Sequence, residues 1–439
     1  MIPLASDSSP VVFPPRRLLL LAALLLGAFF FVDCHSLAAQ SLDADEAEEA
    51  LANAVGSGSA PRRVAYLVVA GIGIVLAIGH SQYSLRRPRP MAIVLSGYLA
   101  LVAASILWST DAAMTARRVL AFSCFAVGAW GLSRRLSLRD LAVVCLVVTA
   151  ALLVLAVGAE FLHGTFRPWA ADFRFTGTTH PNQTAMYCAG LCLTAACLAD
   201  VPGSPRRLLA GLFVAGLILL LLTRSRTGTA AFGVAFAVLW ILKSVREKRL
   251  LVPVAALTLL TAGALVASCC GVDLAKQLPN AIMLGRGNET EDPLNGRSEL
   301  WEELVHAIQQ RPLLGYGYGS FWNASRVEDF SAEFHWGING AHSAVLETAL
   351  AVGWLGLAMV AILIVLGLGQ ALADYWRDPS AASAFLFVLL LYGLVHGMAE
   401  SCFGLVPFLI LCGLVRLAFP PQEVNGVPEA SGVPEVNGV

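Results

Sequence analysis

The chain has 439 residues, of which 57% are hydrophobic and only 13% are charged. Its mean hydropathy of +0.72 is far above that of soluble domains, so a lipid bilayer is the expected solvent for most of the chain. The formal net charge of −1 gives no positive field, and no basic block with interleaved aromatic residues occurs. These features argue against a nucleic-acid-binding protein. They predict a polytopic membrane protein whose partners are lipids or lipid-linked molecules.

The first apolar run, 18–32, follows Arg16 and Arg17 and precedes small residues near Ala38. This arrangement fits a cleaved signal peptide, and it also fits a first transmembrane helix that stays attached. Either alternative exports the segment that follows, so the topology is the same. That segment, 40–61, is rich in Ala, Glu, Asp, Gly and Ser and predicts a solvated spacer without chemistry.

Apolar runs recur along the rest of the chain, and a membrane span needs roughly 20 apolar residues, or fewer where flanking side chains snorkel. The runs lie near 18–32, 64–80, 91–108, 119–133, 140–162, 184–199, 208–223, 228–242, 250–270, 343–373, 381–399 and 402–419. We therefore predict an all-α transmembrane bundle of about twelve spans. The expected limits are a cytoplasmic N-terminus at 1–15, a transmembrane domain at 16–419 and a disordered tail at 420–439.

Lysine and arginine residues accumulate in alternate connections between these runs. Every connection on one side carries at least one of them, whereas the first connection on the other side, at 40–61, is mostly acidic. The positive-inside rule places the basic side and both termini in the cytoplasm.

Several arginines nevertheless fall on the outer side, against the usual bias. Arg224 and Arg226 stand in the motif TRSRTGTAAF between two apolar runs. The others are Arg117, Arg118, Arg167, Arg174, Arg286, Arg297, Arg311 and Arg326. Arginine is suited to bidentate phosphate contacts in a partly desolvated site. The set predicts binding of a lipid-linked phosphate at the outer leaflet, although any single member could contact an ordinary headgroup or a carboxylate.

The predicted outer segment 271–341 is the large extramembrane loop of the chain. Its stretch SELWEELVHAIQQRP predicts a helix of about three turns that lies along the membrane surface or caps the bundle. The expected apolar face consists of Leu300, Trp301, Leu304, Val305 and Ile308. The glycine–aromatic stretch GYGYGSFW at 315–322 could form a sugar-stacking platform or a simple tight turn.

A histidine follows this loop, at the first turn of a helix expected from about Ser343. The positive end of a helix disfavours imidazolium, so His342 is available as a neutral base for a hydroxyl proton. It could also be only a cap or an interfacial residue, and His180 and His335 are rival candidates. Interfacial acids that could orient a His or an Arg are Glu160, Asp172, Glu347 and Glu400. Of these acids, Glu347 is not expected on the face of His342.

A series of motifs resembles, in order, the O-antigen ligase and polymerase superfamily of bacterial envelope proteins. The motifs occupy 107–118, 174–185, 223–232, 296–321 and 341–357. The resemblance covers about 60–419 and implies a helical bundle of the GT-C glycosyltransferase type with a large periplasmic loop. It also implies metal-independent transfer of a glycan from undecaprenyl diphosphate to an acceptor hydroxyl, with no cofactor, at the periplasmic face of the bacterial inner membrane.

The resemblance implies roles for individual residues. Arg224 and Arg226 match the paired outer arginines that hold the diphosphate, and His342 matches the histidine that activates the acceptor hydroxyl. Arg174 and Arg297 match further recurrent arginines that we assign to substrate binding. Fixed cations would stabilise the leaving diphosphate without a metal. The family's more common His-Asn pair is His-Ser in this sequence, which puts any contact from an amide after the histidine in doubt.

The acceptor defines the remaining alternatives. Lipid A-core makes the protein an O-antigen ligase, another glycan makes it a polysaccharide polymerase, and a protein side chain makes it an O-oligosaccharyltransferase. A metal-dependent transferase would use carboxylates such as Asp43 and Asp45, but these lie in the spacer. A non-enzymatic transporter of lipid-linked sugars would more often show internal repeats and charged or broken helices at the membrane midplane, which the sequence does not indicate.

Overall fold

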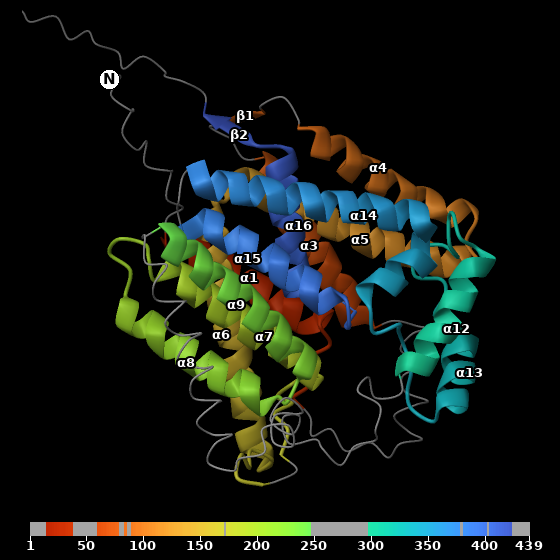
Figure 1. The fold of residues 1–439 in the computed structure, drawn as a ribbon, viewed down its shortest axis with the longest axis horizontal. Helices are drawn as coiled ribbons and strands as arrows, with labels where there is room; N and C mark the ends of the chain where they lie inside the picture. Colours follow the sequence, from red (N-terminus) through yellow and green to blue (C-terminus); the bar gives the residue numbers. More distant parts are fainter. Residues whose placement is uncertain are drawn as a thin grey trace, which may run out of the picture.

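The computed structural model describes residues 15–37, 59–78, 83–85, 89–170, 173–246, 297–377, 381–401 and 404–423. These residues form a bundle of helices (Figure 1). The helices are α1 (Pro15–Val32), α3 (Ala60–Ile78), α4 (Pro90–Ala104), η1 (Ser105–Leu107), α5 (Ala112–Arg135), α6 (Leu138–His163), α7 (Pro181–Leu198), α8 (Arg206–Leu222), α9 (Arg226–Arg246), α12 (Arg297–Gln310), α13 (Ala324–Phe334), α14 (Ala344–Arg377), α15 (Ala381–Gly397) and α16 (Leu405–Ala418). Two three-residue strands, β1 (Tyr83–Leu85) and β2 (Pro421–Glu423), pair antiparallel.

The apolar runs of the sequence become the long helices of the bundle. Within the described ranges, six helices are long and apolar enough to cross a membrane: α3, α4 extended through η1, α5, α6, α9 and α14. Shorter apolar helices form most of α15 and α16. The predicted all-α, multi-pass membrane architecture is therefore confirmed. The run predicted at 250–270 lies outside the described residues.

Short polar side chains fix where several helices begin. Ser137 and Asp140 form a reciprocal capping box at α6, and each satisfies a backbone N–H of the other's segment. Asp111 accepts a hydrogen bond from the backbone N–H of Met114 at α5, and Asn323 caps α13 in the same way. These caps set the register in which each apolar face meets its neighbours.

Basic side chains at one end of the bundle bind carbonyl groups of neighbouring helices. The guanidinium of Arg416 donates to the carbonyl oxygens of Ser133 and Leu136, at 2.9 and 2.8 Å. Arg135 donates in the same way to Leu76 at 3.1 Å. Arg135 follows the apolar run at 119–133, in a basic connection that the sequence places in the cytoplasm. The arrangement agrees with the predicted alternation of helix ends, while the orientation in a membrane remains a prediction.

The first helix packs into the core. Leu25 and Phe29 are fully buried, and the ring of Phe29 lies 5.2 Å from that of Phe408 between centroids. Just beyond α1, Asp33 accepts a hydrogen bond from the hydroxyl of Tyr187 at 2.5 Å. The helix contacts α3 and α6 along its length. This packing favours the attached transmembrane helix over the cleaved signal peptide, because cleavage would remove part of the core.

The long helix α14 is interrupted near its beginning, where Val352 and Gly353 leave the helical conformation. The interruption frees carbonyl groups of the preceding turn. Leu350 O accepts a hydrogen bond from the backbone N–H of Tyr316 at 2.8 Å, and Ala351 O accepts one from the following loop residue at 3.0 Å. The loop after α12 thus replaces the missing helical hydrogen bonds, as a buried backbone requires.

The glycine-rich stretch at 315–322 makes this close docking feasible. Gly315 has φ of +63°, and a Cβ added there would lie 2.5 Å from Leu350 O. Tyr316 and Trp322 are only 4% and 2% exposed, because both belong to a small core shared with α12. Of the two alternatives that the sequence left open, the structure shows the tight turn. The sugar-stacking platform is wrong for these two rings, since both are buried.

The predicted amphipathic helix is α12, and it covers one end of α14, away from β1 and β2 (Figure 1). Leu300, Leu304 and Ile308 are buried as expected, but Val305 is 42% exposed and faces outward. The helix therefore caps the bundle with a narrower apolar stripe than predicted. The first residue of α12 is Arg297, so the position of this helix places Arg297 at that end of the bundle.

The tail at 420–439, predicted to be disordered, begins with a short strand. Its first residues form β2, in which Pro421 pairs with Leu85 and Glu423 with Tyr83. The remainder of that tail, and residues 1–14 of the predicted cytoplasmic N-terminus, lie outside the described part of the chain.

We expect Phe29→Ala to lower the free energy of unfolding by about 3–5 kcal/mol, because it opens a cavity in the core next to Phe408. Thermal or denaturant unfolding of the protein in detergent measures the change. Phe31, two residues further along α1, is 48% exposed and provides the control. Phe31→Ala should cost less than about 0.5 kcal/mol. Equal effects of the two substitutions would show that α1 does not pack as described.

Candidate active site

The arginine pair of the TRSR motif lies in the tight connection between α8 and α9. Thr223 and Ser225 fix this connection, because their hydroxyls accept the backbone N–H groups of Ser225 and Gly228 at 3.2 and 3.3 Å. Arg224 has φ of +50°, a conformation that non-glycine residues seldom adopt and that is concentrated at functional sites. Arg226 is the first residue of α9, and the positive end of a helix favours anions.

Arg174 lies directly beside this connection. Its Nε donates to Thr223 O at 3.0 Å, and its Nη2 donates to the amide oxygen of Asn182 at 3.1 Å. The loop that carries Arg174 is held in place by Glu160 at the end of α6. One carboxylate oxygen of Glu160 accepts the backbone N–H groups of Thr176 and Gly177, at 2.9 and 2.8 Å. Glu160 therefore orients the loop backbone and not an Arg or a His side chain.

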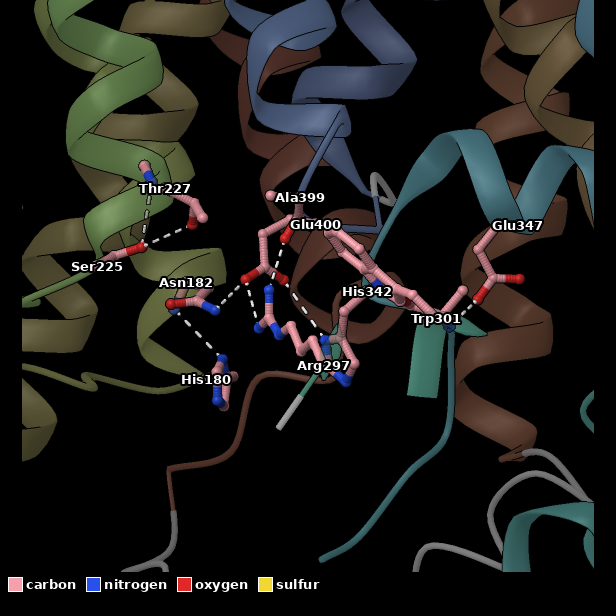
Figure 2. A network of polar contacts seen from close by, with 12 residues as sticks. His180, Asn182, Ser225, Thr227, Arg297, Trp301, His342, Glu347, Ala399 and Glu400 are labelled. Carbon is pink, nitrogen blue, oxygen red and sulfur yellow. Dashed lines mark hydrogen bonds and ion pairs between the residues drawn. The ribbon is translucent and has the colours of Figure 1, made fainter. Parts of the chain in front are cut away.

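Glu400 is the centre of the site. One of its carboxylate oxygens accepts a hydrogen bond from the amide of Asn182 at 2.5 Å and forms an ion pair with Arg297 at 2.9 Å. The other oxygen lies 3.6 Å from Nδ1 of His342. Arg297 also donates to Ala399 O at 2.6 Å. Figure 2 shows this line of contacts, in which one buried carboxylate joins α7, α12 and the segment before α14.

The charge of this carboxylate is stabilised by its partners. Burial alone would raise the pKa of Glu400, but the hydrogen bond from His342 and the charge of Arg297 outweigh burial. The pKa of Glu400 is therefore lower than its ordinary value. Glu400 is ionised at neutral pH, and it holds an imidazole and a guanidinium on its two sides.

His342 is held by its backbone as well as by its ring. It has φ of +48°, and the residue before it, Ala341, receives a hydrogen bond from Trp301 Nε1 at 2.8 Å and donates its N–H to Glu347 at 2.7 Å. The ring of Trp336 lies 5.4 Å from the imidazole between centroids. Glu347 thus supports the backbone and does not contact the imidazole, as the sequence predicted.

The neighbours of His342 favour one tautomer. Nδ1 lies 3.6 Å from a carboxylate oxygen of Glu400, an arrangement that favours a proton on Nδ1 and a lone pair on Nε2. Nε2 is buried and has no hydrogen-bond partner in the described ranges. A carboxylate-oriented imidazole with an unpaired nitrogen is the arrangement expected of a general base.

The structure brings the candidate residues of the sequence into one site. Arg174, Arg297 and His342 are linked through Asn182 and Glu400, and the connection with Arg224 and Arg226 adjoins Arg174. The sequence reasoning missed Asn182, although an amide directly after His180-Pro181 at a helix start was a usable signal. His335, a rival base, ends α13 and takes no part in these contacts. Arg286 and Asp172 lie outside the described residues.

Metal ligands are not gathered in this site. No group of three or more His, Cys, Asp or Glu side chains arranged for a metal ion occurs in the ranges that the structure describes. Asp43 and Asp45, the metal-binding alternative of the sequence, lie outside those ranges. Metal independence therefore stays a prediction.

We expect Glu400→Gln to lower the free energy of unfolding by roughly 3 kcal/mol at neutral pH, because it leaves the mostly buried Arg297 without its counter-charge. The folded-state pKa of Glu400 is lowered, so its contribution is fully present above the ordinary carboxyl pKa. It is lost as the pH falls through the folded-state value. The difference between wild type and variant should therefore shrink in acid.

The matched control is Asp374→Asn, which breaks the longer, half-exposed pairs that Asp374 forms with Arg89 and Arg377 at the other end of the bundle. Such pairs contribute less than about 1 kcal/mol. A loss for Glu400→Gln that is no larger than this, or that grows in acid, would contradict the assigned ion pair.

Comparison with known proteins finds similarity over part of the chain. The O-antigen ligase family model matches residues 211–361, which include Arg224, Arg226, Arg297 and His342. The chain is 26% identical over 226 residues to the general O-oligosaccharyltransferase of Acinetobacter baylyi, a match that covers 49% of this chain and 39% of the relative.

A second similar protein is the exopolysaccharide production protein ExoQ of Rhizobium meliloti, which is 28% identical over 103 residues. That match covers 22% of this chain and 24% of the relative. The chain thus matches less than half the length of each of these curated relatives. The family match and both relatives agree with the resemblance that the motifs indicate, and residues 211–361 of the chain match the O-antigen ligase family.

Proposed function

We propose that the protein transfers a glycan from undecaprenyl diphosphate to an acceptor hydroxyl of lipid A-core, as an O-antigen ligase does, at the periplasmic face of the bacterial inner membrane. The observation that carries the proposal is the Glu400 cluster, which consists of Glu400, Asn182, Arg297 and His342. At one end of the helical bundle, this cluster brings an imidazole with an unpaired nitrogen close to several arginines. In this proposal residues 16–419 form the ligase domain and 271–341 its periplasmic loop.

The cluster supports a single displacement at the anomeric carbon of the glycan. The acceptor hydroxyl gives its proton to Nε2 of His342, while its oxygen forms the new bond to the anomeric carbon. The bond from that carbon to the diphosphate oxygen breaks, and the electron pair stays on the diphosphate. Glu400, on the Nδ1 side, stabilises the imidazolium that forms.

The arginines supply the charge that the leaving group needs. Arg224 and Arg226 stand at the start of α9, and Arg174 lies beside them. A guanidinium group binds phosphate oxygens through paired donors, and Arg174 is already held by Thr223 and Asn182, so it can meet the developing charge with little rearrangement. Arg297 is held by Glu400 and adds its field from the side of the base.

The relatives support glycan transfer and keep two further acceptors open. One is named a general O-oligosaccharyltransferase, and the other an exopolysaccharide production protein. A protein hydroxyl or a second glycan would use the same base and the same arginines. The family match favours all three transferases over a transporter of lipid-linked sugars.

The proposal is tested by complementing a deletion strain with His342→Ala. We expect unmodified lipid A-core beside full-length lipid-linked polymer, because removal of a general base lowers the rate by about 10²–10⁴-fold. Mass analysis of lipid A-core and of lipid-linked glycan measures both products. His306→Ala, an exposed histidine on α12, should restore the wild-type pattern.

The same analysis separates the alternatives. Single-repeat lipid-linked glycan would make the protein a polymerase, and loss of glycan from proteins alone would make it an oligosaccharyltransferase. Full modification of lipid A-core by His342→Ala would refute the assigned base.

Arg224→Lys and Arg226→Lys should each lower turnover by about 10- to 100-fold, because an ammonium cannot replace a bidentate, charge-assisted contact with phosphate. Transfer by the purified protein, with EDTA present to test the metal-free mechanism, measures the effect. Arg207→Lys, an exposed residue at the other end of α8, is the matched control. Wild-type turnover in both site variants would contradict the proposed binding of the diphosphate by Arg224 and Arg226. Loss of wild-type activity in EDTA would contradict the metal-independent mechanism.

A further inference from the structure

A second histidine adjoins the Glu400 cluster. His180 caps the start of α7, where its Nδ1 accepts the backbone N–H of Asn182 at 3.3 Å. The segment before it is fixed by the hydroxyl of Thr184, which donates to Thr176 O at 2.6 Å and contacts Thr179 at 3.0 Å. The imidazole is therefore held in one orientation by α7, while its surface stays accessible.

The surroundings of His180 favour its neutral form. Partial burial, and then the positive charge of Arg174, lower the pKa of His180 to about 4. His342 and Arg297 act in the same direction, and the charge of Glu400 opposes them. Arg174 lies near His180 because both contact Asn182. Arg174 binds the side-chain oxygen of Asn182, and the backbone N–H of Asn182 donates to His180. At neutral pH this ring is an uncharged imidazole.

The two imidazoles of the site hold opposite tautomers. His342 faces a carboxylate with Nδ1, so its Nε2 is an acceptor. His180 accepts a backbone N–H with Nδ1, so its single proton resides on Nε2. A neutral imidazole in that tautomer cannot take a proton at Nε2, but it can donate a hydrogen bond there. His180 is thus unsuited to be the base and suited to bind an oxygen.

We propose that His180 is a donor-substrate binding residue whose Nε2–H donates a hydrogen bond to a phosphate oxygen of the lipid-linked diphosphate. This inference rests on the proposed function. His180 contacts Asn182, which also binds Arg174, whereas His342 lies beyond Glu400 (Figure 2). In this proposal the diphosphate lies near His180, and the acceptor hydroxyl lies near His342. His180 keeps its proton throughout the reaction.

An uncharged donor suits this position physically. The site already holds Arg174 and Arg297, and an imidazolium beside them would repel both and weaken the array. A neutral N–H adds a hydrogen bond to an anionic oxygen without adding charge.

His180→Asn separates the two nitrogens of the ring. Asparagine is among the best helix N-caps, so it replaces the Nδ1 acceptor and preserves the start of α7, but it has no group at the position of Nε2. We expect the dissociation constant of undecaprenyl diphosphate to rise about 10- to 100-fold, the range for a hydrogen bond to a charged group. Binding to the purified full-length protein in nanodiscs measures it. The melting temperature should stay at the wild-type value.

The kinetics provide the second readout. With glycan-loaded donor, kcat/KM for the donor should fall by a similar factor, while its pH dependence between pH 5 and 8 keeps the wild-type shape, because His180 does not titrate there. His342→Ala should instead lose transfer and retain undecaprenyl diphosphate binding. The contrast between the two variants identifies His180 as a binding group.

Two results would overturn the inference. One is wild-type affinity for undecaprenyl diphosphate in His180→Asn. The other is complete loss of transfer in His180→Asn with unchanged binding, which would make His180 the base. Failure of the proposed function looks different, since the wild-type protein would then bind undecaprenyl diphosphate but glycosylate no acceptor, and the binding comparison would still test His180.

Discussion

The site depends on one buried carboxylate that serves three elements at once. Glu400 contacts the amide of Asn182 at the start of α7, the guanidinium of Arg297 at the start of α12, and the imidazole of His342 before α14. Burying a charge is costly, and only a full set of partners offsets the desolvation. The carboxylate therefore fixes the relative positions of segments that are far apart in the chain.

This arrangement places two imidazoles, those of His180 and His342, in different surroundings, so we propose different roles for them. In the proposed reaction, the imidazole beside the carboxylate accepts a proton and the imidazole beside a backbone N–H donates a hydrogen bond. Arg297 binds the carboxylate, and Arg174 binds Thr223 in the connection that leads into α9. The proposed reaction needs a base near the acceptor and cations near the leaving diphosphate.

Part of this could be predicted from the sequence, because membrane proteins impose strong local rules. Apolar runs predicted the helices, and arginines on the predicted outer side marked Arg174, Arg224, Arg226 and Arg297 as candidates. The pairing of Glu400 with its partners could not be predicted by spacing alone, since a residue close to α16 meets one at the start of α7 only through the tertiary fold.

Backbone features were also hidden from local patterns. The interruption of α14 at Val352 and Gly353 lies within a continuous apolar run, so hydropathy gives no sign of it. It is stabilised by the loop at 315–322, for which the sequence left a sugar-stacking platform and a tight turn open. The interruption lies in the first third of α14 and is capped by that loop, unlike the midplane breaks that a transporter would show.

The central claim concerns where the diphosphate lies relative to the two imidazoles. A structure of the protein in nanodiscs with bound undecaprenyl diphosphate tests it directly. The account places the phosphate oxygens against Arg174, Arg224 and Arg226, with Nε2 of His342 on the opposite side of the Glu400 carboxylate. A diphosphate bound at the basic end near Arg135 and Arg416, or one in direct contact with His342 and remote from the α8–α9 connection, would contradict it.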